Sequence, residues 1–246
     1  MKYERRMMGS FVFIALAAII MHTLAGITVE PGVNKEYIKR GLKVIPNQVT
    51  LVVLDYRGFD TLGECLVLVT GVLAVSMLYG RGSLMKVGMG GPEKPDLKPT
   101  LILESFTPYM VALSIAYGIY LTLGGHITPG GGFQGGSIIA AGGCLSLIIY
   151  GRKHMMEISH QKLVKIESAG LLLYLLIGLV GAVTSGYYLY NVGADANSMI
   201  APGVRGWFEY PDGLNAGIIP YLNLAVMLKV SAGLLTILLV LLEVKK

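Results

Sequence analysis

Residues 218–242 read IIPYLNLAVMLKVSAGLLTILLVLL, an apolar run with a single charged residue, Lys229. A helix of about 20 apolar residues spans the roughly 30 Å hydrocarbon core of a bilayer. This run therefore predicts a transmembrane helix. At 1.5 Å per residue, Lys229 would lie about 15 Å below the start of the run, near the centre of the membrane.

Five earlier apolar segments resemble this one in length. Of the 246 residues, 54% are hydrophobic and 14% are charged, and the mean hydropathy is +0.64. A soluble domain carries about 25% charged residues, so a soluble protein is excluded. The sequence predicts an all-α, polytopic membrane protein with about six transmembrane helices, at residues 9–28, 61–80, 105–124, 134–150, 166–190 and 218–242.

The distribution of basic residues predicts the orientation. If both termini are cytoplasmic, 13 of the 20 basic residues lie inside and six lie outside. The positive-inside rule therefore favours N-in and C-in, although the cluster from Lys35 to Lys43 runs against it. The first apolar run is longer than the core of a signal peptide and lacks a small-residue cleavage pattern, so we expect it to be retained.

A break in composition divides the chain. Residues 89–99, MGGPEKPDLKP, contain three prolines and four charges, which cannot continue a membrane helix. We expect a two-helix unit over residues 1–98 and a four-helix unit over residues 99–246, joined near Pro92.

Lys229 is the sharpest candidate for function. A charge at the centre of a membrane helix costs about 3 kcal/mol, and a lysine at that depth cannot snorkel to the interface. Two interpretations stay open, namely a buried ion pair that is purely structural and a member of a proton or ion path. The candidate partners are Glu64, Glu104 and Glu167.

Residues 55–64, DYRGFDTLGE, gather charges just before the second expected helix. Asp60 and Glu64 are four residues apart and would share one helical face, where two carboxylates could attract a cation or hold a proton. Thr61 and Glu64 also fit a capping box, in which both side chains serve the helix start. Both interpretations stay open.

Residues 124–136, GGHITPGGGFQGG, form a glycine-rich loop without the lysine of a phosphate-binding loop, so nucleotide binding is excluded. The expected role is packing, because small residues recur every four positions at Gly136, Ala140 and Cys144, and again at Gly178, Ala182 and Gly186. The loop could also line a polar break with His126. The expected packing residues are Gly130, Gly131, Gly132, Gln134, Gly135 and Gly136.

Several classes of function are excluded. Cys65 and Cys144 both lie in apolar runs and form no C-x-x-C pair, so we expect neither a zinc nor an iron–sulfur site and no cofactor. No nucleophile stands with a base, so we expect no enzyme activity of its own. The basic residues are scattered, which argues against nucleic acid as a partner.

Two long motifs resemble known families. GGHITPGGGFQGG and YLNLAVMLKV, at residues 221–230, resemble the MnhB or MrpB family, the B-type subunits of multisubunit Na⁺/H⁺ antiporters, over about residues 100–246. VLDYRGFDTLGE, at residues 53–64, resembles the C-terminal end of the large A-type subunit of these antiporters, over about residues 1–98. It also resembles the corresponding small subunit of membrane-bound hydrogenases.

These resemblances imply an accessory subunit in the cell membrane. In typical antiporters the two units are separate polypeptides, so their fusion suggests the membrane arm of an energy-converting hydrogenase or a sulfane sulfur reductase complex. The implied partners are large A- and D-type subunits, small C-, E-, F- and G-type subunits, a redox arm, Na⁺, H⁺ and the bilayer. Alternatives are a structural spacer and a subunit of a free-standing Mrp-type antiporter. The implied path residues are Lys229, Glu64, Asp60, His126 and Glu104.

Overall fold

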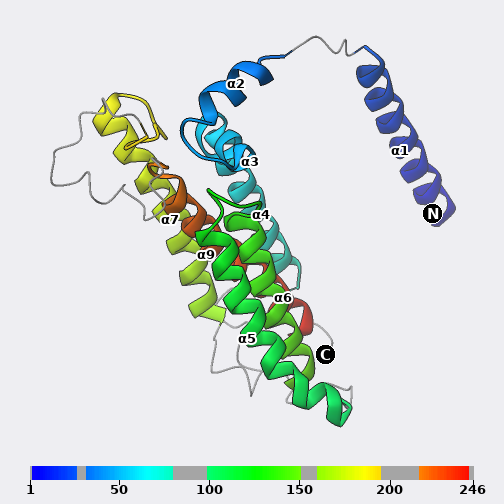
Figure 1. Ribbon diagram of the computed structural model, residues 1–246. Coiled ribbons are helices and arrows are strands. Elements are labelled where there is room, and N and C mark those ends of the chain that lie inside the picture. Colours follow the sequence, from blue (N-terminus) through cyan, green and yellow to red (C-terminus); the bar gives the residue numbers. More distant parts are fainter. Residues whose placement is uncertain (1, 27–31, 80–98, 151–159, 195–215, 244–246) are drawn as a thin grey trace. The chain divides into compact units, whose positions relative to one another are not determined.

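The computed structural model describes residues 2–26, 32–79, 99–150, 160–194 and 216–243 (Figure 1). Throughout these ranges the regular structure is helical, which confirms the all-α prediction. The chain divides into two compact units, Met1–Ile38 and Lys39–Lys246. The boundary expected near Pro92 lies outside the described residues, so the division into residues 1–98 and 99–246 stays a prediction.

The first unit contains α1, Lys2–Ala25, which covers most of the first expected span. Its apolar part, Phe13–Thr23, is shorter than a full membrane span. Helix α2, Asn34–Gly41, was not expected and crosses the division between the units. Whether α1 crosses the membrane stays a prediction.

The second unit contains the other five expected spans. They are α4 (Gly58–Tyr79), α5 (Leu101–Leu123), α6 (Gly132–Tyr150), α7 (His160–Ser185) and α9 (Ile219–Glu243). All five are long and apolar enough to cross a bilayer, as expected for a multi-pass membrane protein. The N-in, C-in orientation stays a prediction.

Helix α9 forms the centre of this unit. It contacts α4, α5, α6 and α7. In its apolar segment 67% of the residues are buried, compared with 17% in α5. Lipid solvates apolar side chains as well as protein does, so the outer helices can expose theirs at little cost. Lys229, at the middle of α9, therefore lies inside the helix bundle.

Glycines let α6 approach two neighbours closely. A Cβ atom at Gly135 would lie 2.4 Å from the carbonyl oxygen of Gly118 in α5. On another side of α6, a Cβ atom at Gly132 would lie 2.0 Å from the carbonyl oxygen of Asn223 in α9. Both neighbours are backbone atoms, which cannot move aside as a flexible side chain would.

We expect Gly135→Ala to lower the thermal stability of the detergent-solubilised protein, because the new methyl group forces α5 and α6 apart. Overpacking of this kind typically costs about 1–3 kcal/mol. Gly63→Ala is the matched control, since nothing lies within 4 Å of a Cβ atom there. Equal melting temperatures for the two variants would contradict the close packing of α5 on α6.

Helix α7 ends earlier than expected, at Ser185 instead of residue 190. Gly186 adopts φ 81°, a left-handed conformation that ends helices and favours glycine. The chain then folds back on α7, where the Leu189 backbone N–H donates to the Gly178 carbonyl at 3.1 Å. The helix–helix approach expected at Gly178 is therefore wrong, since the Tyr188 ring occupies that place.

The segment before α4 also differs from the expectation. Helix α3 (Gln48–Leu51) continues into a π-helical turn, η1 (Val52–Tyr56), and α4 begins at Gly58. Thr61 therefore lies within α4, and its hydroxyl donates to the Val53 carbonyl at 2.6 Å. The capping box predicted at Thr61 and Glu64 is wrong, because the helix starts one turn earlier.

Candidate functional site

Lys229 forms a buried ion pair between α9 and α7. Its Nζ atom donates to Oε1 of Glu167 at 2.9 Å, and the two side chains are 1% and 8% exposed. Of the three partners considered from the sequence, the structure selects Glu167. Two charges enclosed in a helix bundle interact strongly, because little water is present to screen them.

Glycines bring the two helices of this pair together. A Cβ atom at Gly170 of α7 would lie 2.7 Å from the backbone nitrogen of Lys229. A Cβ atom at Gly233 of α9 would lie 3.2 Å from Oε1 of Glu167. The small residues thus allow the lysine of α9 and the carboxylate of α7 to meet within the bundle.

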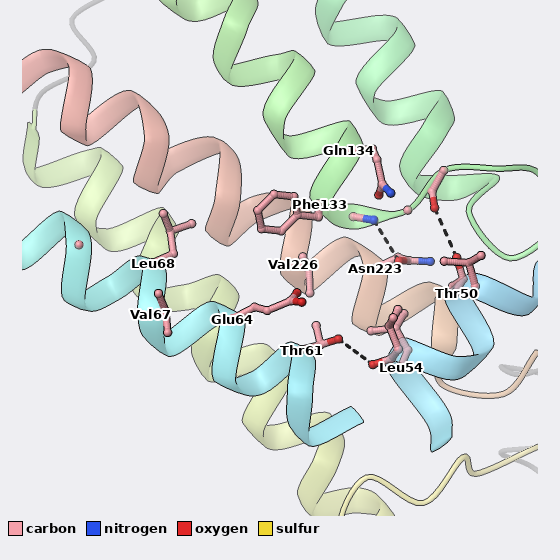
Figure 2. A pocket seen from close by; sticks show the side chains of 16 residues that line it. Thr50, Leu54, Thr61, Glu64, Val67, Leu68, Phe133, Gln134, Asn223 and Val226 are labelled. Carbon is pink, nitrogen blue, oxygen red and sulfur yellow. Dashed lines mark hydrogen bonds between the residues drawn. The ribbon is translucent and has the colours of Figure 1, made fainter. Parts of the chain in front are cut away.

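A second feature is a pocket of ≈ 730 Å³ at the beginnings of α4 and α6 (Figure 2). Its walls come from α3, η1, α4, the glycine-rich loop, α6 and α9. The lining residues are Val49, Thr50, Val53, Leu54, Thr61, Glu64, Val67, Leu68, Gly71, Gly130, Gly131, Gly132, Phe133, Gln134, Asn223 and Val226. Residues of both the DYRGFDTLGE segment and the glycine-rich loop therefore line one pocket. The sequence alone did not place these two segments together.

The two carboxylates of the DYRGFDTLGE segment have different surroundings. Glu64 lines the pocket, and Figure 2 shows its side chain extending toward Val226 of α9. Asp60 forms an ion pair with Arg57, and both of these side chains are at least half exposed. Glu64 therefore faces the pocket, whereas Asp60 is already neutralised outside it.

Asn47 fastens the glycine-rich loop to the start of α3. Its Nδ2 atom donates to the carbonyls of Gly125 and Thr128 at 2.7 and 2.8 Å, and to the Thr50 hydroxyl at 2.8 Å. Its Oδ1 atom accepts from the Thr50 backbone N–H at 3.2 Å and so caps α3. One side chain thus joins two segments that both line the pocket.

Asn223 holds the other end of the loop. Its Oδ1 atom accepts from the Gly132 backbone N–H at 3.0 Å, a bond drawn in Figure 2. Its Nδ2 atom is buried without a hydrogen-bond partner among the described residues. Neither asparagine was expected from the sequence, although a polar residue within the 218–242 run was a signal for Asn223.

The remaining expected path residues lie in different places. His126 is buried in the turn after α5, and its carbonyl accepts from the Asn47 backbone N–H at 3.2 Å. Glu104 is exposed in the first turn of α5, about 30 Å along that helix from the glycine-rich loop. The structure therefore brings His126, but not Glu104, near the pocket.

Relatives with similar sequences include antiporter subunits. An uncharacterised protein of Methanocaldococcus jannaschii is 39% identical over 247 residues, covering 96% of this chain and 91% of that protein. The B-type subunit of the Na⁺/H⁺ antiporter of Bacillus subtilis is 36% identical over 79 residues. That match covers 32% of this chain and 55% of the Bacillus protein, so the chain spans about half of it.

Two solved structures share the fold. One is the membrane-bound sulfane sulfur reductase, an archaeal respiratory membrane complex, with a TM-score of 0.68 and 23% identity. The match covers 97% of this chain and 98% of the other. The second is the Mrp complex of a Dietzia species, with a TM-score of 0.68 and 21% identity, covering 99% of this chain and 26% of the other.

A family model also matches the second unit. It describes a domain related to the MnhB subunit of Na⁺/H⁺ antiporters and matches residues 102–236, within the range expected from the sequence motifs. This match covers more than half of the chain. The chain therefore belongs to the MnhB family.

Proposed function

We propose that the chain is an accessory, non-catalytic subunit of a multisubunit cation/proton (Na⁺/H⁺) antiporter module in the cell membrane. The observation that carries this proposal is the buried pair of Lys229 and Glu167. Ionisable residues inside membrane helices are rare, and they commonly mark ion paths or proton relays. Because the chain belongs to the MnhB family, we propose that this pair takes part in transport and not in enzyme chemistry.

The ion pair and the pocket are linked through α9. Val226 lines the pocket and lies three residues before Lys229 in that helix. Glu64 lines the pocket while Lys229 lies in the core, so a proton or cation entering the pocket would meet Glu64 before Lys229. We propose Lys229 and Glu64 as the leading path residues, with Asp60, His126 and Glu104 as secondary members.

We further propose that the module belongs to a redox-driven complex of the sulfane sulfur reductase type. The structural match to that complex spans nearly all of both chains, whereas the match to the Mrp complex covers about a quarter of the larger chain. The expected partners are A- and D-type and small C-, E-, F- and G-type antiporter subunits, with a redox arm. A relationship to hydrogenases stays a prediction from the sequence.

A structural spacer is the second candidate. It is favoured by the same ion pair, because a lysine already matched by a carboxylate needs no further role. The closely packed glycines of α6 also suit a rigid element. The two candidates differ in what happens to transport when the charges are removed and the complex still assembles.

We expect Lys229→Ala and Glu64→Gln each to reduce Na⁺/H⁺ exchange at least tenfold per assembled complex, because each removes a charge from the proposed path. Exchange is measured by a pH-sensitive dye in everted membrane vesicles, normalised to the complex recovered on native gels. Lys165→Ala, which removes an exposed lysine of α7, is the control. Wild-type exchange per complex in both variants would overturn the ion path and favour the spacer.

A further inference from the structure

The pocket presents a negative charge without a counter-charge. Glu64 is the one ionisable side chain among the described residues that line it. It lies six residues beyond the start of α4, roughly 9 Å along a helix that is apolar enough to span the membrane. Within the described part of the chain, no hydrogen bond or ion pair involves its carboxylate.

Two basic side chains of the described residues already form ion pairs with carboxylates other than Glu64. Lys229 is paired with Glu167, and Arg57 is paired with Asp60. An exposed carboxylate on a membrane helix is costly in contact with lipid, and such residues commonly pair with another charge. The counter-charge for Glu64 is therefore expected from outside the described part of this chain.

We propose that the pocket receives a lysine or arginine carried by a transmembrane helix of a neighbouring subunit. The volume of ≈ 730 Å³ is large enough to hold several side chains from one helix edge. The walls around Glu64 are apolar, and Val67 and Phe133 expose 73% and 45% of their surface. This surface suits an apolar helix that carries one basic residue.

The alternatives match the pocket less well. A bound metal ion needs several ligands, and the described residues contain no group of three His, Cys, Asp or Glu side chains that could hold one. An anionic lipid headgroup would be repelled by Glu64. The inference rests on the proposed role as part of a larger complex, but it makes a separate prediction about contacts.

The test places a benzophenone photo-crosslinker at Val67 or at Phe133 in the full complex within native membranes. We expect attachment to a membrane span of another subunit, within about one helical turn of a lysine or arginine. The same probe at Val183, which is 79% exposed on α7 and outside the pocket, should give a different pattern. Attachment to lipid only, to a second copy of this chain, or to a span without a basic residue would overturn the proposal.

Charge reversal then tests the pairing itself. We expect Glu64→Lys to reduce the amount of assembled complex at least fivefold, because two cations would meet, and the partner's reversal from Lys or Arg to Glu to restore it. Glu64→Gln keeps the shape but leaves the partner's cation without its counter-charge, so it should lower the amount of assembled complex less than Glu64→Lys, which adds a repulsion. Lack of rescue would overturn the pairing. Normal exchange by Glu64→Gln complexes would instead count against the proposed ion path and leave the pairing intact.

Discussion

Glu167→Ala is expected to destabilise the second unit by about 3–5 kcal/mol, because it leaves the ammonium group of Lys229 buried without its counter-charge. Lys229 is fully buried, so its side chain cannot reach water without moving the helices around it. We expect less protein in the membrane and a clearly lower melting temperature in detergent. Thermal unfolding followed by size-exclusion chromatography measures this change.

The double variant Glu167→Gln with Lys229→Met provides the control for that result. It removes both charges and keeps side chains of similar size, so most of the lost stability should return. Glu36→Ala, which removes an exposed carboxylate of α2, should change little. If Glu167→Ala were as stable as the wild type, the buried pair would not exist as described.

Asn47→Ala is expected to cost about 3–4 kcal/mol of stability, at roughly 1 kcal/mol for each hydrogen bond lost. The substitution removes the bonds to the Gly125 and Thr128 carbonyls and to the Thr50 hydroxyl, and the cap on α3. Gly125 is buried, so its carbonyl cannot simply turn to water. The melting temperature of the solubilised protein measures the effect.

A matched asparagine distinguishes this local effect from a general one. Asn34 is also a helix-start asparagine, and its Oδ1 atom accepts from the Lys35 backbone N–H at an exposed position. We expect Asn34→Ala to lower the melting temperature far less than Asn47→Ala. A similar loss in both variants would show that Asn47 does not fasten the glycine-rich loop to α3.

The long helices could be predicted from the sequence because apolar length is a local property. The second unit has all five of its expected spans, and Lys229 lies in the core of its helix bundle. The α7 boundary failed because Gly186 ends the helix inside a run that remains apolar and aromatic. The composition of a segment shows that it is apolar, but it does not show the backbone conformation of a single residue such as Gly186.

The site was harder to predict because it depends on contacts between distant segments. Three carboxylates were equally eligible as partners of Lys229, and the crossing of α7 over α9 at Gly170 selects Glu167. Asn47 and the Thr128 carbonyl are 81 residues apart, and no local pattern links them. The π-helical turn before α4, which moved the helix start away from Thr61, also gave no signal in the sequence.

We propose that Lys229, paired with Glu167, belongs to an ion path, and that the pair does not merely stabilise the fold. The most direct test is Na⁺/H⁺ exchange by the complex that contains the double variant Glu167→Gln with Lys229→Met, measured per assembled complex in everted vesicles. We predict a complex recovered in near-normal amount with exchange reduced at least tenfold. Wild-type exchange by that assembled complex would contradict the claim and identify the pair as structural.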